Sequence, residues 1–209
     1  MKRRNLLTSL IFALAVAGMN LVSPGCGVSA ETWIQLALSL ANTVLTALPG
    51  IITALQSLMG GTTPVLTAAQ LAKLTKVFQG AENLFTTAIA DINLYQKNAD
   101  PTLIGKIEDI LNQIKSSLGS VLTDVQVTNA ALVAKITAAV DSIVGLADTI
   151  LSVLPSVISG KLVAKKVSKQ QMARLAPETW AASFNLAIHK PTGDAAVDAA
   201  FAQVNAVEK

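Results

Sequence analysis

Apolar residues recur at helical spacing along most of the chain after residue 30. The clearest pattern follows Asp100-Pro101, a pair that suits a helix start because aspartate caps free amides and proline fits the first turn. Gly119 marks its expected end, and its apolar face comprises Leu103, Ile104, Ile107, Ile110, Leu111, Ile114 and Leu118. The other patterns predict helices over 64–80, 81–97 and 128–155, a helical segment from Pro177, and a last helix capped by Asp194. We therefore expect an all-α fold, a helical bundle of about five or six helices.

The stretch from Thr32 to Gly61 is the expected centre of this bundle. It has thirty residues without a charged side chain and is interrupted once, at Pro49-Gly50. Proline removes an amide donor and clashes with the preceding turn, so a kink or a restart of the helix is expected there. Residues 41–53 are echoed by residues 147–159, in which Pro155 takes the place of Pro49. The pattern predicts two proline-kinked core helices, and either chance similarity or an ancient duplication explains the echo.

The composition agrees with a helical fold. Of 209 residues, 52% are hydrophobic and only 4% are aromatic, whereas a β-sandwich or barrel uses more aromatic residues and more turn glycines. A chain of this length can bury roughly 70% of its unfolded surface, so one core suffices without a metal or a disulfide.

The first thirty residues have the features of an export signal. Lys2, Arg3 and Arg4 supply the positive start, an apolar run covers 6–22, and Ala30 ends a cleavage site of small residues. We expect a signal peptide over 1–30 with cleavage after Ala30, and an exported protein that is periplasmic, envelope-anchored or extracellular. The alternative is an uncleaved membrane anchor, since 17 mostly apolar residues are close to the minimum for a membrane span.

Cys26 is the single cysteine and follows Gly25 just after the apolar run. This arrangement resembles a bacterial lipoprotein signal, in which the cysteine is acylated and becomes the first residue of the mature protein. Ser23 and Pro24 depart from that pattern, so the competing interpretation is a cysteine that is discarded with the leader. Under both interpretations a disulfide within one mature chain is excluded.

The net charge of +3 comes from the leader. Residues 31–209 hold thirteen basic and thirteen acidic residues, which gives zero, so the sequence indicates no nucleic-acid partner. Residues 161–174 are basic, with no acidic residue and five basic ones: Lys161, Lys165, Lys166, Lys169 and Arg174. Lysines beside aliphatic residues can contact an anionic lipid surface. The competing interpretation is a solvated helix whose lysine stems cover apolar neighbours.

Residue types for catalysis or metal binding are scarce. The single histidine, His189, lies beside Lys190-Pro191 without a second ligand nearby and is expected to be a solvated loop residue. A Gly-x-Ser-x-Gly motif does not occur, and Gly60-Gly61-Thr62-Thr63 lacks the lysine of a phosphate-binding loop. We therefore expect no catalytic residue, no metal and no cofactor, in a protein that is not an enzyme.

These features divide the chain into a leader over 1–30, a helical bundle over 31–160, and a C-terminal helical appendage over 161–209 that docks on the bundle or stays partly flexible. The expected function is that of an exported structural or interaction protein of the bacterial cell envelope. It would act through apolar helix packing on an unidentified protein partner or on itself. One alternative is a membrane-active protein whose uncharged kinked helices insert into lipid, and another is a carrier with a cavity for an apolar ligand.

Overall fold

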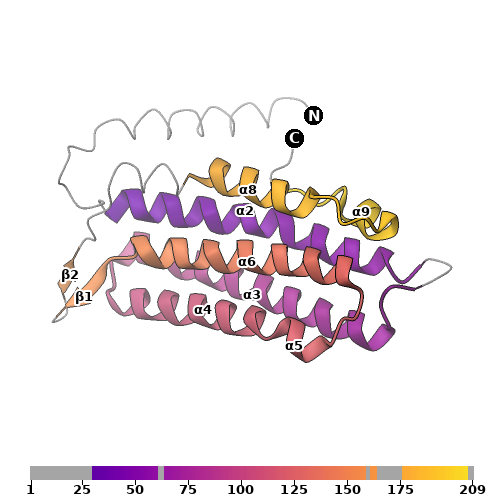
Figure 1. Cartoon of the computed structure of the whole chain (residues 1–209). Coiled ribbons are helices and arrows are strands. Elements are labelled where there is room, and N and C mark those ends of the chain that lie inside the picture. Colours follow the sequence, from indigo (N-terminus) through magenta and orange to yellow (C-terminus); the bar gives the residue numbers. More distant parts are fainter. Residues whose placement is uncertain (1–29, 61–63, 159–160, 164–175, 207–209) are drawn as a thin grey trace, which may run out of the picture.

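Four antiparallel helices form a closed ring in the computed structural model, which describes residues 30–60, 64–158, 161–163 and 176–206. The four are α2 (Ala30–Ser57), α3 (Ala68–Asn98), α4 (Thr102–Gly119) and α6 (Ala130–Val153). Each packs against the next of the four along the chain, and α6 returns to pack against α2 (Figure 1). The predicted all-α helical bundle is confirmed.

Two further helices cover one side of the ring. α8 (Pro177–His189) lies along α2 and α6, and the shorter α9 (Ala195–Phe201) packs against the same two helices (Figure 1). Their buried residues join the core of the bundle and are Ala181, Phe184, Ile188, Val197 and Phe201, followed by Val204 and Ala206. α8 and α9 are thus packed on the bundle.

α2 continues through Pro49 without a restart. Leu48 and Ile51, on either side of the proline, are completely buried, and Leu55 continues the same buried face. Burial of one such side chain stabilises a fold by about 1.5–3 kcal/mol, so several of them offset the lost amide donor. Packing against the neighbouring helices therefore holds the second half of α2 in line with the first.

The echo of this segment folds differently, which corrects the prediction of two proline-kinked core helices. α6 ends at Val153, and Pro155 lies beyond its end. Strand β1 (Ser156–Ile158) follows and pairs antiparallel with β2 (Lys161–Val163). After Pro49, four buried apolar residues pack in the rest of α2, whereas Pro155 is followed by Ser156, two apolar residues and then a Ser-Gly pair. Too little apolar surface remains there to hold further helical turns against the bundle.

α3 is longer than predicted, because it merges the two helices that were expected on either side of Gly80. It begins at a capping box, in which Thr67 and Gln70 each accept the backbone amide of the other, and not at Pro64. A glycine costs about 1 kcal/mol in a helix interior. Buried aromatic residues on both sides of Gly80 outweigh that cost.

Four other helices, α4, α6, α8 and α9, begin close to where the sequence indicated. Asp100 accepts the amide of the first residue of α4 at 2.9 Å, and this bond lowers the pKa of its carboxyl group. Asn129 caps α6, Pro177 is the first residue of α8, and Asp194 caps α9. A short helix that the sequence had not indicated, α5 (Val121–Val125), connects α4 to α6.

Candidate functional site: a buried lysine at the junction of α6, α8 and α9

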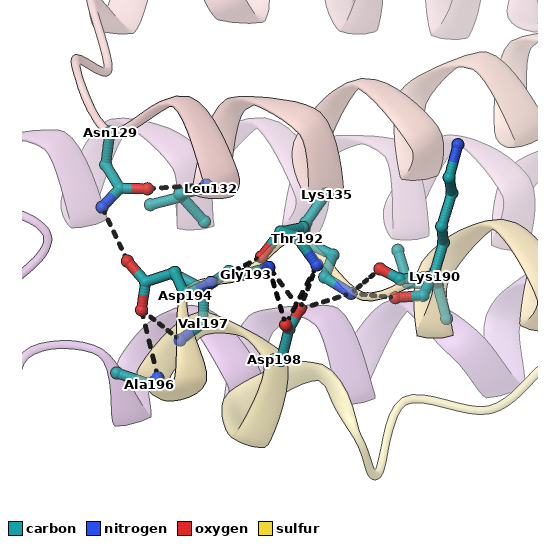
Figure 2. A network of polar contacts seen from close by, with 11 residues as sticks. Asn129, Leu132, Lys135, Lys190, Thr192, Gly193, Asp194, Ala196, Val197 and Asp198 are labelled. Carbon is teal, nitrogen blue, oxygen red and sulfur yellow. Dashed lines mark hydrogen bonds and ion pairs between the residues drawn. The ribbon is translucent and has the colours of Figure 1, made fainter.

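Lys135 is the one charged side chain among the described residues that is fully buried, with 2% of its surface exposed. It extends from α6 toward the turn that joins α8 to α9 (Figure 2). Its Nζ donates to the carbonyls of Ile188 at 2.7 Å and Lys190 at 2.8 Å, and lies 3.1 Å from Oδ1 of Asp198. The three partners use all three N–H groups of the ammonium.

The two carbonyls belong to the end of α8, where the last carbonyls of a helix lack partners within the helix. Lys135 supplies hydrogen bonds to them and also places a positive charge at the negative end of the helix dipole. An unpaired charge in this position would cost several kcal/mol. The lysine can therefore be buried only when α8 and α9 are both in place.

Asp198 holds the turn between α8 and α9. Its carboxylate accepts the amide of Thr192 at 3.0 and 3.1 Å, the hydroxyl of Thr192 at 2.9 Å and the amide of Gly193 at 3.3 Å. Gly193 has a φ of +88°, which glycine adopts without strain. The Thr192 amide above all, with Lys135 adding to it, lowers the pKa of Asp198 to about 2, although desolvation acts in the opposite direction.

Asn129 and Asp194 connect the starts of two helices. Asn129 Oδ1 accepts the amide of Leu132 at 2.8 Å, and Asp194 Oδ1 accepts the amides of Ala196 and Val197 at 3.1 and 3.2 Å. The two caps also meet, because Asn129 Nδ2 donates to Asp194 Oδ2 at 3.1 Å (Figure 2). This bond is the main reason that the pKa of Asp194 is lowered. It fixes the start of α9 against the start of α6.

The segment after α9 is attached to α2 and α8. The carbonyl of Ala206 accepts the hydroxyl of Thr46 in α2, and the amide of Ala206 donates to Asn185 Oδ1 at 3.1 Å. His189 Nε2 lies 2.8 Å from the carbonyl of Val204. His189 is exposed, as predicted, but it is the last residue of α8 and not a loop residue.

Gly50 lies against this segment at a distance that leaves room for a Cβ atom. A Cβ atom built at position 50 would lie 3.5 Å from Cα of Val204 and 3.9 Å from its Cβ. Val204 itself is 1% exposed. The small residue after Pro49 thus lies where the end of the described chain crosses α2.

The polar groups at the junction hold the helices together and leave no group free for catalysis or ligand binding. Every N–H group of Lys135 is bound to an acceptor of the same chain, so none is directed at a ligand. Within the part of the chain that the structure describes, no group of three or more His, Cys, Asp or Glu side chains could hold a metal ion. What the arrangement can do is attach α8 and α9 to α6 in one orientation.

The structure describes two of the residues predicted for export and lipid contact. Ala30, the predicted cleavage site, is the first residue of α2, and Lys161 is the first residue of β2. Lys161 therefore begins a strand and not the solvated helix that was considered for the basic residues. The other predicted residues lie outside the described part of the chain: Cys26, Lys165, Lys166, Lys169 and Arg174.

Sequence reasoning overlooked Lys135. A signal was present, because this lysine lies three residues after Leu132 and four before Ala139, on the buried face of α6. A lone lysine on an apolar helix face indicates a buried partner. Two of its partners are backbone carbonyls, which have no sequence signature.

Comparisons with known proteins do not assign a role to this junction. No protein-family model, no curated protein and no solved structure matches the chain. A function can therefore be inferred only from the sequence and the geometry of the chain itself.

Proposed function

We propose that the chain is an exported, non-enzymatic protein of the bacterial cell envelope that works as a folded helical bundle and binds another protein or a second copy of itself. The observation that carries the proposal is the burial of the uncharged face of α2. Its largest side chains are at most 1% exposed and pack within the chain's own core: Trp33, Leu40, Leu48, Ile51 and Leu55. The apolar surface of α2 is thus satisfied internally, which supports a folded bundle over an inserted one.

The outer face of α2 supports a protein partner. Its exposed positions after the first turn carry no charge and are polar except for Pro49, and they include Gln35, Asn42, Thr53 and Gln56. Asn42 and Thr53 donate to carbonyls of their own helix at 2.8 and 2.9 Å. A helix that faces lipid presents apolar side chains outward, whereas short polar groups lose little entropy when a protein surface covers them.

A second candidate function is insertion into a membrane. Two described helices, α2 from Glu31 onward and α6, are long and apolar enough to cross a bilayer by length and composition. The core helices of a soluble bundle meet the same criteria. The packing of α2 against α3, of α6 against α4, and of both against α8 and each other accounts for their buried apolar residues without a membrane.

Export is the part of the proposal that rests on the leader sequence. The intact mass of the protein after export shows where the leader was cleaved and whether Cys26 carries a lipid. A chain that begins at Glu31 would indicate cleavage after Ala30, and a chain that begins at an acylated Cys26 would indicate a lipoprotein. Recovery of the whole unprocessed chain in the cytoplasm would contradict export.

Membrane fractionation of a Cys26→Ala form tests the folded bundle. Acylation cannot hold this form at a membrane, so alkaline carbonate should release the processed protein without detergent. Association that resists carbonate would instead support insertion and would overturn the proposal.

A photo-crosslinking amino acid at Asn42 tests for the partner surface. Asn112, which is exposed on α4, provides a matched control position. We expect a discrete crosslinked product, either a dimer or a complex with another protein, from position 42 and not from position 112. Equal products from both positions, or none from position 42, would count against this face.

A further inference from the structure

Leu186 on α8 is the most exposed large apolar side chain of the described residues, at 79%. Leu94, Val157 and Val163 are the next most exposed and reach 45% at most. α8 lies on the outside of the ring of four helices (Figure 1). One exposed leucine is ordinary on a protein surface, so the residues beside it decide whether it marks a contact.

Leu186 belongs to a row of exposed residues that are four positions apart: Glu178, Ala182, Leu186 and Lys190. Residues at this spacing lie beside one another along one side of a helix and form a ridge. The first residue of the row is negative, the last is positive, and the two between them are uncharged. These four residues are called the α8 ridge below.

The bundle holds the α8 ridge in one orientation. Trp180 Nε1 donates to the carbonyl of Ser142 in α6 at 2.9 Å, and the indole stacks on Phe184 with 5.2 Å between the ring centroids. At the other end of α8, Lys135 Nζ binds the last carbonyls. These contacts keep α8 from rotating, so Leu186 stays directed outward. A surface that is already ordered loses little entropy when a partner covers it.

The charges at the two ends of the ridge are available to a partner. Among the described residues, neither Glu178 nor Lys190 takes part in an ion pair, since the pairs found there join Lys115 to Asp148 and Lys135 to Asp198. Lys190 contributes only its carbonyl to the junction, and Figure 2 shows its side chain extending away from Asp198. Both charges can therefore meet opposite charges on another molecule.

The α8 ridge is complementary to itself. Residues 178 and 190 are equally far from residue 184 along the chain, and so are residues 182 and 186. A second copy turned end to end about this level thus brings its Lys190 to Glu178 and its Ala182 to Leu186. The small alanine leaves room for the leucine, and two-fold symmetry forms each pair twice. Two ridges of this spacing pack with their helices about 50° apart, which is the commonest angle between packed helices.

We propose that two copies of the chain form a dimer through the α8 ridge, with α8 of one copy antiparallel to α8 of the other. The charge complementarity of the ridge with itself favours a second copy over an unrelated partner. This inference deepens the proposed function, on whose folded bundle it rests, and it does not require the partner surface on α2. The contact is one helix wide, so the dimer is expected to be weak and to dissociate on dilution.

Analytical ultracentrifugation of the processed Cys26→Ala protein tests the dimer. We expect a monomer–dimer equilibrium, and Leu186→Asp should raise its dissociation constant about a hundredfold, because two leucines lose their contact. Leu94→Asp on α3 is the control and should leave the dissociation constant unchanged, with the urea midpoints of both variants as the check of folding. A natural chain that stays monomeric up to about 0.5 mM would overturn the proposal.

Charge reversal tests the register of the two copies. Glu178→Lys and Lys190→Glu each place like charges opposite one another, and each variant alone should dimerise about tenfold more weakly. A mixture of the two variants again pairs opposite charges at both ends, so it should form a heterodimer with the affinity of the natural chain. This recovery also shows that both variants are folded.

Three results would overturn the assignment to the α8 ridge. The first is a dimer that Leu186→Asp leaves unchanged, and the second is a mixture of the two charge variants that dimerises no better than either alone. The third is a monomeric chain that binds phosphatidylcholine vesicles through Leu186, because lipid would then cover the ridge. Crosslinking at Asn42 reports separately on the surface of α2, so failure there and failure of the α8 dimer are distinguishable.

Discussion

Lys135 Nζ lies 3.1 Å from Asp198 Oδ1, and this ion pair joins α6 to α9 across the end of α8. The lysine is buried, whereas the carboxylate keeps 28% of its side-chain surface exposed. Because Lys135 also donates to two carbonyls at the end of α8, its charge is satisfied only when both C-terminal helices are docked. The pair therefore specifies one position for these helices.

Replacing Lys135 with methionine should destabilise the protein. Lys135→Met preserves much of the apolar length of the side chain but leaves the carbonyls of Ile188 and Lys190 without their donor. We expect the free energy of unfolding to fall by about 3 kcal/mol, measured by urea denaturation. Lys115→Met is the control, because the Lys115–Asp148 pair, at 2.5 Å, has side chains that are 33% and 55% exposed. That pair should contribute less than about 1 kcal/mol, and equal losses in the two variants would contradict the role of Lys135.

Asp198 should contribute to stability in a defined pH range. Its pKa is about 2 in the folded chain and near 3.8 in an unfolded one, so the folded state binds its proton less readily. The stabilisation is complete above about pH 4 and is lost as the pH falls from about 4 to about 2. Urea midpoints measured across this range should fall less steeply for Asp198→Asn than for the natural chain. If the urea midpoints of the two proteins fall in parallel, Asp198 does not contribute this pH-dependent stability, because all other carboxylates are present in both proteins.

A disulfide between positions 50 and 204 should form and stabilise the docked C-terminal segment. The built Cβ of Gly50 lies 3.9 Å from Cβ of Val204, which is within the range of natural disulfides. Gly50→Cys with Val204→Cys, in a Cys26→Ala background, should oxidise readily and raise the unfolding midpoint relative to the reduced form. The chain-entropy model gives an upper value of about 5 kcal/mol for so long a loop. Replacing Leu186 instead of Val204 provides the control, which should not crosslink because Leu186 faces solvent. If the double variant also stays reduced under oxidising conditions, the docking of this segment is wrong.

The two echoed prolines should respond oppositely to alanine. Pro49 is exposed inside α2, so Pro49→Ala restores an amide donor and should raise the free energy of unfolding by about 1 kcal/mol. Pro155 is buried beyond the end of α6, so Pro155→Ala removes packing and should lower it by a similar amount. Thermal and urea unfolding of both variants provide the measurement. A stabilising effect at both positions would mean that Pro155 also interrupts a helix.

Much of the helical bundle could be predicted because its signals are local. Caps such as Asp194 and faces such as that of α4 depend on residues within a few turns, and both were found in the sequence. The wrong predictions concern helix ends that depend on packing between residues far apart in the sequence. Gly80 does not stop α3 because aromatic residues on both sides are buried, and Pro155 ends α6 because little apolar sequence follows it.

The junction around Lys135 was predictable only in its separate parts. The cap formed by Asp194 has a local signature, but its partner Asn129 is 65 residues away along the chain. The lysine itself interrupts an apolar face, which could have been noticed. Its carbonyl acceptors become evident only when the ends of the helices are seen side by side.

The contact between Thr46 and Ala206 spans 160 positions of the chain. α2 is therefore the first described helix to leave the ribosome and the last to be enclosed. Until α8 and α9 have been synthesised, the side of α2 and α6 that they cover stays open to chaperones. For the export that we propose, that delay would keep the chain loosely folded until it reaches a translocation pore.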